Sequence, residues 1–382
     1  MTHKHVLIAG ASGLVGYAAV KHFAAQAGVQ VTAVSRRTPF GLDHLGIRFV
    51  SADLNDQAQC ESLFGAMHDV THLVYAALHE QPALIAGWRE QEQILTNDRM
   101  LRHLLAPLAR AARALRHVTL LQGTKAYGAH VRRMDLPARE GRSEARDIPN
   151  FYWNQENYLK ECQHSAGWAW TILRPQIIFG QSFGSAMNAI PALGVYAALL
   201  REHGEPLYYP GGPSNILEAV DADLLARAIA WAGEADAARN ETFNVTNGDV
   251  FQWSGVWPAV ADALGMDAGP PRPRSLAATL PAEAADWERI RQRYNLVSPS
   301  LTDYVGASLQ YLDYLMAYGA KTGDKISVVS TVKIRQAGFG EAMDTEAMFR
   351  KWFRLFEEQK LLPPSRIHAV RRRKEDPSPT SG

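Results

Sequence analysis

Cysteine is scarce in this chain of 382 residues, which contains only Cys60 and Cys162. At most one disulfide bond can form, so the sequence excludes a small scaffold held together by disulfides. This usage is typical of the reducing cytoplasm, which is the compartment we expect. Both thiols are expected to be packed in the interior rather than to act as nucleophiles.

The chain also lacks an excess of charge of either sign, because 40 Lys and Arg residues balance 39 Asp and Glu residues for a net charge of +1. A dedicated nucleic-acid surface would need a basic excess, so we expect no nucleic-acid partner. No apolar run is long enough to cross a membrane, and the first expected strand begins at His5, which leaves no room for a targeting segment. The 13 histidines show no metal-ligand spacing, so no metal site is predicted.

A glycine-rich turn near the amino terminus is the strongest signal that is present. The apolar run Val6–Ala9 ends at Gly10, Gly13 and Gly16, and an apolar-periodic helix follows from Ala18. Gly10 permits a tight turn, Gly13 lets the backbone approach a pyrophosphate, and Gly16 lets the helix pack close to the strand. The free N–H groups of the helix N-terminus bind the anion. The pattern predicts a dinucleotide-binding fold.

Apolar strands alternate with helical segments through the first half of the chain. Strands are expected at 31–35, 47–50, 71–76, 117–121 and 170–175, and helices at about 88–114 and 149–164. This alternation predicts an α/β protein with a Rossmann-like doubly wound parallel sheet. We expect a dinucleotide-binding domain at 1–180 with strand returns near 207–250, a smaller, mostly helical substrate lobe at 181–365, and a disordered tail at 369–382.

The residues after the second strand indicate which dinucleotide is bound. Ser35 is followed by Arg36 and Arg37, where chains that bind NAD carry an acidic residue for the ribose 2′-hydroxyl, and no carboxylate comes before Asp43. Arginine pairs with a 2′-phosphate and stacks on adenine, so the sequence predicts NADPH as the cofactor. For one of the two arginines, a solvated basic turn is the alternative.

Residues at the ends of the next strands complete the expected cofactor site. Asp53 is expected to reach the adenine edge, with the N-cap of the following helix as its alternative role. Small residues after Tyr75 let the ribose and phosphates pass. The residues expected to contact the cofactor are Gly10, Ser12, Gly13, Leu14, Val15, Gly16, Ser35, Arg36, Arg37, Asp53, Leu54, Tyr75, Ala76, Ala77, Gln122, Pro175, Ile177 and Ile178.

A tyrosine near the start of the helix before the sixth strand is the expected catalytic group. Tyr152 occupies this place, but Glu156 stands four residues later, where reductases of this architecture carry a lysine. A lysine there lowers the phenol pKa and a carboxylate raises it, so the ordinary pair is broken. Lys125, at the end of the fifth strand, is the lysine placed to substitute. A pair of Lys125 with Tyr127 is the less favoured alternative.

These stretches together resemble the progesterone 5β-reductase and iridoid synthase-like enone reductases, a branch of the extended short-chain dehydrogenases. The resemblance covers nearly the whole chain. It includes the glycine turn, the two arginines, and the residues at 69–72, 123–127, 150–152, 174–180, 243–253 and 338–340. The stretch FNVTNGDVFQW at 243–253, together with the displaced lysine, is its most specific part.

The resemblance implies a 1,4-reduction, in which NADPH delivers hydride to the β-carbon of an enone or enal, a 3-oxo-Δ4-steroid among the candidates. Negative charge then develops on the carbonyl oxygen as an enolate. Tyr152 would hydrogen-bond that oxygen and Lys125 would stabilise it by positive charge. Water could protonate the α-carbon afterwards.

Positions expected near the substrate depart from the plant members of this family. Leu78 stands where an aromatic often lines the pocket, Gly128 where a bulkier residue lies, Trp153 where a second tyrosine lies, and Ile177 where an asparagine lies. The natural substrate is therefore left open. The residues expected to contact the substrate are Leu78, Tyr127, Gly128, Trp153 and Phe339, with a lid drawn from the helix at 186–200.

Three other interpretations are weighed against enone reduction. A carbonyl reductase shares the same cofactor site. A sugar-nucleotide epimerase-like dehydrogenase would carry an acidic ribose ligand and a Tyr-x-x-x-Lys motif, and this chain has neither at the corresponding positions. A non-catalytic NADPH-binding sensor or scaffold fits the loss of the usual lysine but not the retention of Lys125. The apolar helices of the C-terminal lobe are compatible with a homodimer.

Overall fold

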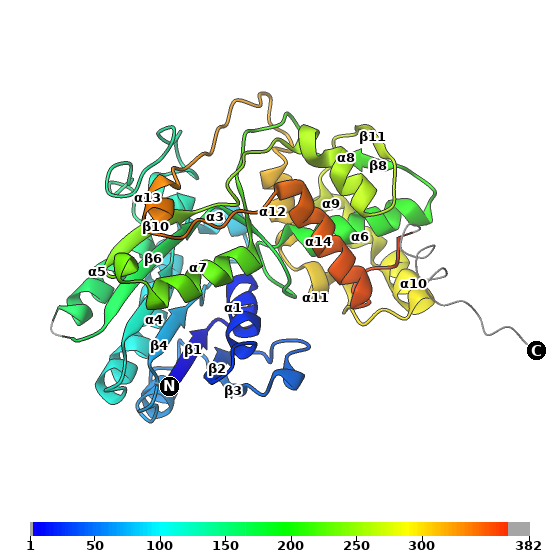
Figure 1. The fold of residues 1–382 in the computed structure, drawn as a ribbon. Coiled ribbons are helices and arrows are strands. Elements are labelled where there is room, and N and C mark those ends of the chain that lie inside the picture. Colours follow the sequence, from blue (N-terminus) through cyan, green and yellow to red (C-terminus); the bar gives the residue numbers. More distant parts are fainter. Residues whose placement is uncertain (1–2, 165, 366–382) are drawn as a thin grey trace, which may run out of the picture. The chain divides into compact units, whose positions relative to one another are not determined.

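The computed structural model describes residues 3–164 and 166–365, which form two compact units (Figure 1). The first unit comprises Met1–Phe183, Ile216–Val250 and Lys325–Met343, and the second comprises Gly184–Asn215, Phe251–Asp324 and Asp344–Gly382. Two segments from the second half of the chain thus return to the first unit. The tail expected at 369–382 lies outside the described residues.

The first unit is built on a seven-stranded sheet with the order β10-β6-β5-β4-β1-β2-β3. Its strands are β1 (Lys4–Ala9), β2 (Val29–Ser35), β3 (Arg48–Ser51), β4 (His72–Tyr75), β5 (His117–Leu121), β6 (Ala169–Pro175) and β10 (Glu241–Val245). Every neighbouring pair is parallel. The predicted doubly wound fold is confirmed. Of the expected strand returns, β10 joins this sheet beside β6.

Side chains that alternate along the strands fill a separate core on each face of the sheet. In β1, Leu7 packs with the side chains of one core, whereas Val6 and Ile8 pack with those of the other. This alternation follows from the two-residue period of a strand, and both faces are apolar because helices cover both. The sheet is therefore buried on both sides, with its carboxyl edge left to carry the site.

Helices on both faces complete the first unit (Figure 1). One face is covered by α2 (Gln57–Phe64), α4 (Gln91–Ala111) and α5 (Phe151–Gln163), and the other by α1 (Leu14–Ala24), α7 (Ala222–Glu234) and α13 (Val332–Gln336). Shorter elements are α3 (Leu84–Gly87), η1 (Asp43–Leu45), η2 (Thr124–Tyr127), η3 (Asp236–Ala238) and the paired strands β7 (Ile177–Phe179) and β9 (Ala219–Asp221). The helix expected at 88–114 begins three residues later and ends at Ala111.

The second unit is mostly helical. It contains α6 (Ala189–Glu202), α8 (Trp253–Ala263), α9 (Leu276–Thr279), η4 (Leu280–Glu283), α10 (Ala284–Tyr294), α11 (Leu301–Val305), α12 (Ser308–Leu315), α14 (Thr345–Glu358), and the paired strands β8 (Leu207–Tyr209) and β11 (Ala268–Pro271). All residues of α6 from Ala189 to Leu200 are buried, as expected for a helix that is apolar all round. Among the described residues, no helix combines the length and apolar character that crossing a membrane requires.

Three buried histidines lie near the amino ends of adjacent strands. His5 of β1, His72 of β4 and His117 of β5 are each less than a tenth exposed. Threonine hydroxyls accompany them, at 2.8 Å from Nε2 of His5 and 2.9 Å from Nε2 of His117. Burial lowers the pKa of all three imidazoles, to about 4 for His72 and to about 3 for His117. The folded chain therefore holds them neutral.

The pH dependence of the free energy of unfolding tests whether these buried histidines are neutral in the folded chain. A histidine whose pKa is lowered by folding binds its proton more readily in the unfolded chain, so stability is lost as the pH falls below about 6.5. We expect His117 to lower the free energy of unfolding by on the order of 2–3 kcal/mol by pH 4, at about 1.4 kcal/mol for each pKa unit. Urea unfolding of the wild type and His117→Gln between pH 7 and pH 4 measures this difference. Identical pH dependence of the two proteins would contradict it.

Candidate active site

The glycine turn after β1 forms a cradle that only glycine can form. Gly10 has a φ of 84°, and a Cβ there would lie 2.6 Å from backbone atoms of Ala76 and Ala77. A Cβ on Gly16 would overlap the carbonyl oxygen of Gly10. Gly13 is the N-cap of α1 and supplies no side-chain cap, so the first N–H groups of the helix are left for an anion. These residues fit the pyrophosphate of a dinucleotide.

The end of β2 lies beside a hollow that suits the adenosine end of the cofactor. The Ser35 hydroxyl donates a hydrogen bond of 2.6 Å to the carbonyl oxygen of Arg37, which fixes the turn that carries both arginines. Both guanidinium side chains are exposed. The hollow is lined by Ser12, Tyr17, Arg37, Thr38, Phe40, Gln181, Ser182 and Phe183. Of the two predicted arginines, Arg37 is the one that lines it.

Asp53 and Leu54 follow β3 but differ in exposure. Asp53 is exposed, and its carboxylate accepts a 3.0 Å hydrogen bond from the backbone N–H of Asn55. The helix cap is instead Asp56, which accepts from the N–H of Gln59, so the alternative role of Asp53 as N-cap is wrong. Its contact with adenine stays a prediction. The side chain of Leu54 is buried in a core cluster.

At the end of β4, Tyr75 contributes to the core rather than to an open site. Its side chain is 2% exposed, and its hydroxyl has no hydrogen-bond partner among the described residues. Burial raises the pKa of this phenol well above its ordinary value. Only the backbone of Tyr75 can therefore face a cofactor. Backbone atoms of Ala76 and Ala77 lie against Gly10, 2.6 Å from the place that a Cβ on Gly10 would occupy.

Lys125 lies in η2, directly after β5, and is held by groups from three other segments. Its Nζ is 3.7 Å from Oε1 of Glu80, and it lies over the rings of Trp88 and Phe151, 4.5 and 5.8 Å from their centroids. Burial lowers the pKa of Lys125, and the Glu80 carboxylate opposes that shift. The lysine is a nearly buried cation with its own counter-charge.

Tyr152 lies in the first turn of α5, behind the N-cap Asn150. Its hydroxyl is 3.3 Å from the place that a Cβ on Gly123 would occupy, and the Phe151 ring packs edge-on against its own ring at 4.6 Å. Gly123 precedes the turn that carries Lys125. Tyr152 and Lys125 therefore both lie near the carboxyl end of β5, each beside the Phe151 ring, and their joint catalytic role stays a prediction.

Glu156 does not act on Tyr152 as an uncompensated charge. Its Oε1 accepts hydrogen bonds of 2.7 Å from both Arg146 and Lys160, and its Oε2 lies 3.6 Å from Arg174. Burial alone would raise the pKa of Glu156, but these cations hold it below its ordinary value. The residue that breaks the usual Tyr-x-x-x-Lys spacing is therefore a structural carboxylate.

Tyr127, expected at the substrate, belongs to a buried hydrogen-bond network instead. Its hydroxyl donates to Oδ1 of Asn244 at 2.6 Å and accepts from Nη1 of Arg174 at 3.2 Å. Gln122, expected at the cofactor, accepts from Nε of Arg174 at 2.8 Å. Burial raises the pKa of Tyr127 to about 12. The Tyr127 hydroxyl is thus already satisfied inside the unit, and its contact with a substrate stays a prediction.

Three further residues expected to contact the substrate pack against other residues of the first unit. Gly128 has a φ of 76°, and a Cβ there would lie 3.2 Å from side-chain atoms of Ala145 and Ile148. Trp153 donates its indole N–H to the carbonyl oxygen of Ile148 and stacks with cationic side chains. Phe339 lies in a core cluster with its ring against Trp231. Their contact with a substrate stays a prediction. Leu78, 40% exposed, stays a candidate.

The residues at and after the end of β6 lie at the same carboxyl edge of the sheet as Gly123 and Tyr152. The carbonyl oxygen of Pro175 is 3.5 Å from the place of a Cβ on Gly123, beside the Tyr152 hydroxyl. Ile177 is buried at the start of β7, and Ile178 is half-buried. Their contact with the cofactor stays a prediction.

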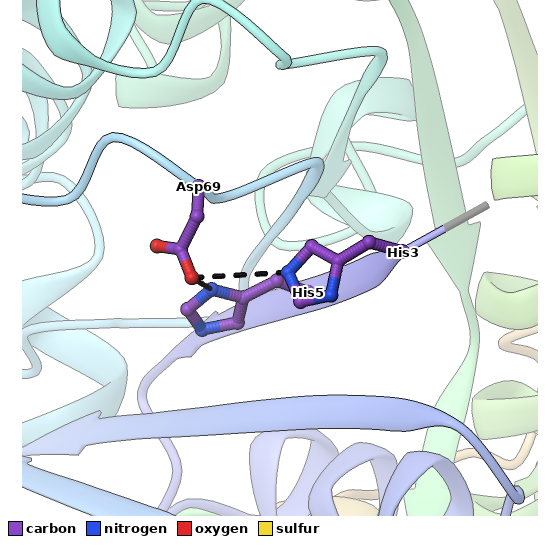
Figure 2. A group of neighbouring side chains, drawn as sticks. All are labelled: His3, His5 and Asp69. Atoms are coloured by element: carbon purple, nitrogen blue, oxygen red, sulfur yellow. Dashed lines mark ion pairs between the residues drawn. The ribbon is translucent and has the colours of Figure 1, made fainter.

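At the amino edge of the sheet, His3, His5 and Asp69 bring three ligand atoms within 4.8 Å of one another (Figure 2). Such a set could hold a metal ion, and the sequence spacing did not reveal it because Asp69 comes from a different segment. The geometry already has an explanation without a metal. Nδ1 of the buried His5 lies 3.1 Å from Oδ2 of Asp69, as expected for an ion pair or hydrogen bond.

Comparison with known proteins points to one family. The model of the NAD dependent epimerase/dehydratase family matches residues 6–246. (S)-8-oxocitronellyl enol synthase of Antirrhinum majus is 29% identical, covering 87% of this chain and 85% of that protein. The enzyme of the same name from Catharanthus roseus is 30% identical over 72% and 71%. The 3-oxo-Delta(4,5)-steroid 5-beta-reductase of Arabidopsis thaliana is 34% identical over 62% of each chain.

Solved structures are similar in fold. UDP-glucose 4-epimerase of Thermotoga maritima with UDP-glucose has a TM-score of 0.65 at 17% identity, covering 93% of this chain and 99% of that one. UDP-glucose 4-epimerase of Thermus thermophilus, in complex with NAD, has a TM-score of 0.60 at 19% identity over 92% and 99%. At these identities the similarity shows the fold alone.

The sequence relatives confirm the resemblance that the motifs indicated. With the glycine cradle and the Tyr152–Lys125 edge, they show that the chain is an enzyme of the NAD dependent epimerase/dehydratase family and belongs to the enone-reductase branch that contains the (S)-8-oxocitronellyl enol synthases and 3-oxo-Delta(4,5)-steroid 5-beta-reductase.

Proposed function

We propose that the protein catalyses the NADPH-dependent 1,4-reduction of the carbon–carbon double bond of an α,β-unsaturated carbonyl compound. The observation that carries this proposal is that the Phe151 ring lies beside both the Tyr152 ring and the ammonium group of Lys125, a lysine from η2. An enone or enal is the substrate class. The match with the oxocitronellyl enol synthases and the steroid 5-beta-reductase supports it.

The cofactor would lie along the carboxyl edge of the sheet. Gly10, Gly13 and the N-terminus of α1 would hold its pyrophosphate, and Arg37 would pair with the 2′-phosphate. When bound, NADPH supplies the hydride that saturates the β-carbon.

Tyr152 and Lys125 would act on the carbonyl end of the substrate. The Tyr152 hydroxyl would donate a hydrogen bond to the oxygen, where negative charge grows as the enolate forms. The charge of Lys125, which lies beside the Phe151 ring, would favour that anion. An enolate is less basic than the alkoxide formed by carbonyl reduction, so full proton transfer from the phenol is less necessary. Water would protonate the α-carbon.

The preference for NADPH is tested at the hollow after β2. Arg37→Gln removes a positive charge from the lining of this hollow, so we expect KM for NADPH to rise by roughly 10-fold or more, as for the loss of a charge-assisted hydrogen bond, with little change for NADH. Arg113→Gln, on an exposed residue after α4, is the matched control. Equal effects of Arg37→Gln on both cofactors would contradict the 2′-phosphate assignment.

The reaction class is tested by product analysis with 2-cyclohexenone, an open-chain enal and a Δ4-3-ketosteroid. We expect a saturated product with the carbonyl group intact. We expect Tyr152→Phe to lower kcat on the substrate that turns over by roughly 10²-fold, as for the loss of one oxyanion donor. An allylic alcohol as the product would favour the carbonyl reductase interpretation instead, and full activity of Tyr152→Phe would remove the phenol from the mechanism.

Two further expectations accompany this proposal. The reducing cytoplasm is the compartment that we propose, since both cysteines are free thiols, with Cys60 buried. A homodimer is also proposed, and sedimentation of the purified chain would test it.

A further inference from the structure

A buried carboxylate faces the lysine of the proposed site. Glu80 follows β4 on the segment before α3, and its side chain is 8% exposed. Its Oε2 accepts a 2.6 Å hydrogen bond from Nε2 of Gln93, a residue of α4 that is itself 1% exposed. Gln93 is oriented in turn by the backbone N–H of Gln81, which donates to its Oε1 at 3.0 Å. Glu80 is therefore held by an amide side chain that is itself fixed.

The second oxygen of Glu80 is directed at Lys125. Oε1 is buried and lies 3.7 Å from Nζ of Lys125. Burial raises the pKa of Glu80, and the lysine opposes that shift. A buried carboxylate with one oxygen satisfied and the other aimed at an ammonium group is an ion pair, and each charge depends on the other.

Few other charged groups lie near the ion pair of Glu80 and Lys125. The walls around the ammonium group are the rings of Trp88 and Phe151. Besides Tyr152, His130 is a titratable neighbour. Burial, aided by the charges of Lys125, Arg89 and Lys325, lowers its pKa to about 4, so it is neutral near pH 7. Arg89, whose Nη2 donates to the carbonyl oxygen of His130 at 3.4 Å, adds positive charge to this side. Among the described residues near Lys125, Glu80 thus supplies the negative charge.

We propose that Glu80 is a positioning residue for the enone reductase reaction, which keeps Lys125 charged and fixed against Phe151 and Tyr152. This inference rests on the proposed function. Glu80 touches no reacting atom, and it acts through the lysine. Because the pair carries no net charge, the ammonium group can stay in a site that excludes water until the enolate adds a negative charge beside it.

The role of Glu80 predicts a change in the pH profile rather than a uniform loss of activity. Without the carboxylate, Lys125 keeps its buried position beside aromatic rings and Arg89 but loses its counter-charge. The pKa of the lysine then falls further, since a buried cation without a partner loses its proton. The basic limb of kcat should move toward neutral pH.

The experiment compares Glu80→Gln with the wild type, with Glu80→Asp, which retains the charge, and with Glu92→Gln, which removes an exposed carboxylate from α4. We expect Glu80→Gln to move the basic limb of kcat down by at least one pH unit, with KM for NADPH unchanged. Glu80→Asp should shift it less, and Glu92→Gln not at all. The pKa of Lys125 can be read directly from its ¹³Cε resonance in labelled protein, which is assigned by its absence in Lys125→Met. We expect this pKa to fall most in Glu80→Gln, less in Glu80→Asp and not at all in Glu92→Gln.

A lower melting temperature of Glu80→Gln with an unchanged pH profile and lysine titration would overturn the proposal, because the pair would then be structural only. If Glu80→Gln does not fold, Glu80→Asp carries the test, since a shorter carboxylate must shift the same limb in the same direction. If the wild type reduces no enone, the proposed function fails. The titration of Lys125 with and without Glu80 still decides whether the carboxylate controls the lysine.

Discussion

The buried guanidinium group of Arg174 holds together the edge of the sheet on which the site depends. The side chain is 1% exposed, and it contacts Gln122 after β5, Tyr127 in η2, Glu144 in the following loop and Glu156 on α5. A buried charge is tolerated only when its partners are in place, so the burial of this one cation fixes four segments together. Its ion pair with Glu156 ties α5, the helix whose first turn carries Tyr152, to this edge.

Arg174 and Lys125, the two buried cations at this edge of the sheet, have different counter-charges. Arg174 takes the carboxylates of Glu144 and Glu156, and Lys125 takes that of Glu80. In a helix with the usual Tyr-x-x-x-Lys spacing, one lysine would stand beside the phenol. Here that position belongs to a carboxylate, and the lysine comes from η2 with its own counter-charge. Such a separation suits a reaction that must stabilise an enolate more than it must transfer a proton.

Spacing in the sequence was enough to predict the sheet and the glycine turn after its first strand, because those signals are local, and the pair of Tyr152 with Lys125 stays a prediction. It did not reveal Glu80, which follows β4 in a segment without periodicity and meets Lys125 only because β4 and β5 are neighbours. Nor did it show that Tyr127 and Phe339 are interior residues, since their partners Asn244 and Trp231 come from distant segments. Long-range polar pairing leaves little trace in a single sequence.

The most direct measurement of the central claim is the position of the transferred hydrogen. The enzyme would be given NADPH deuterated at C4 of the nicotinamide, on each face in turn, with the enone that it reduces. One of the two should place deuterium on the β-carbon of a saturated ketone or aldehyde, as the enolate mechanism at Tyr152 and Lys125 requires. Deuterium on the former carbonyl carbon would contradict it, because the bond reduced would then be the carbonyl group.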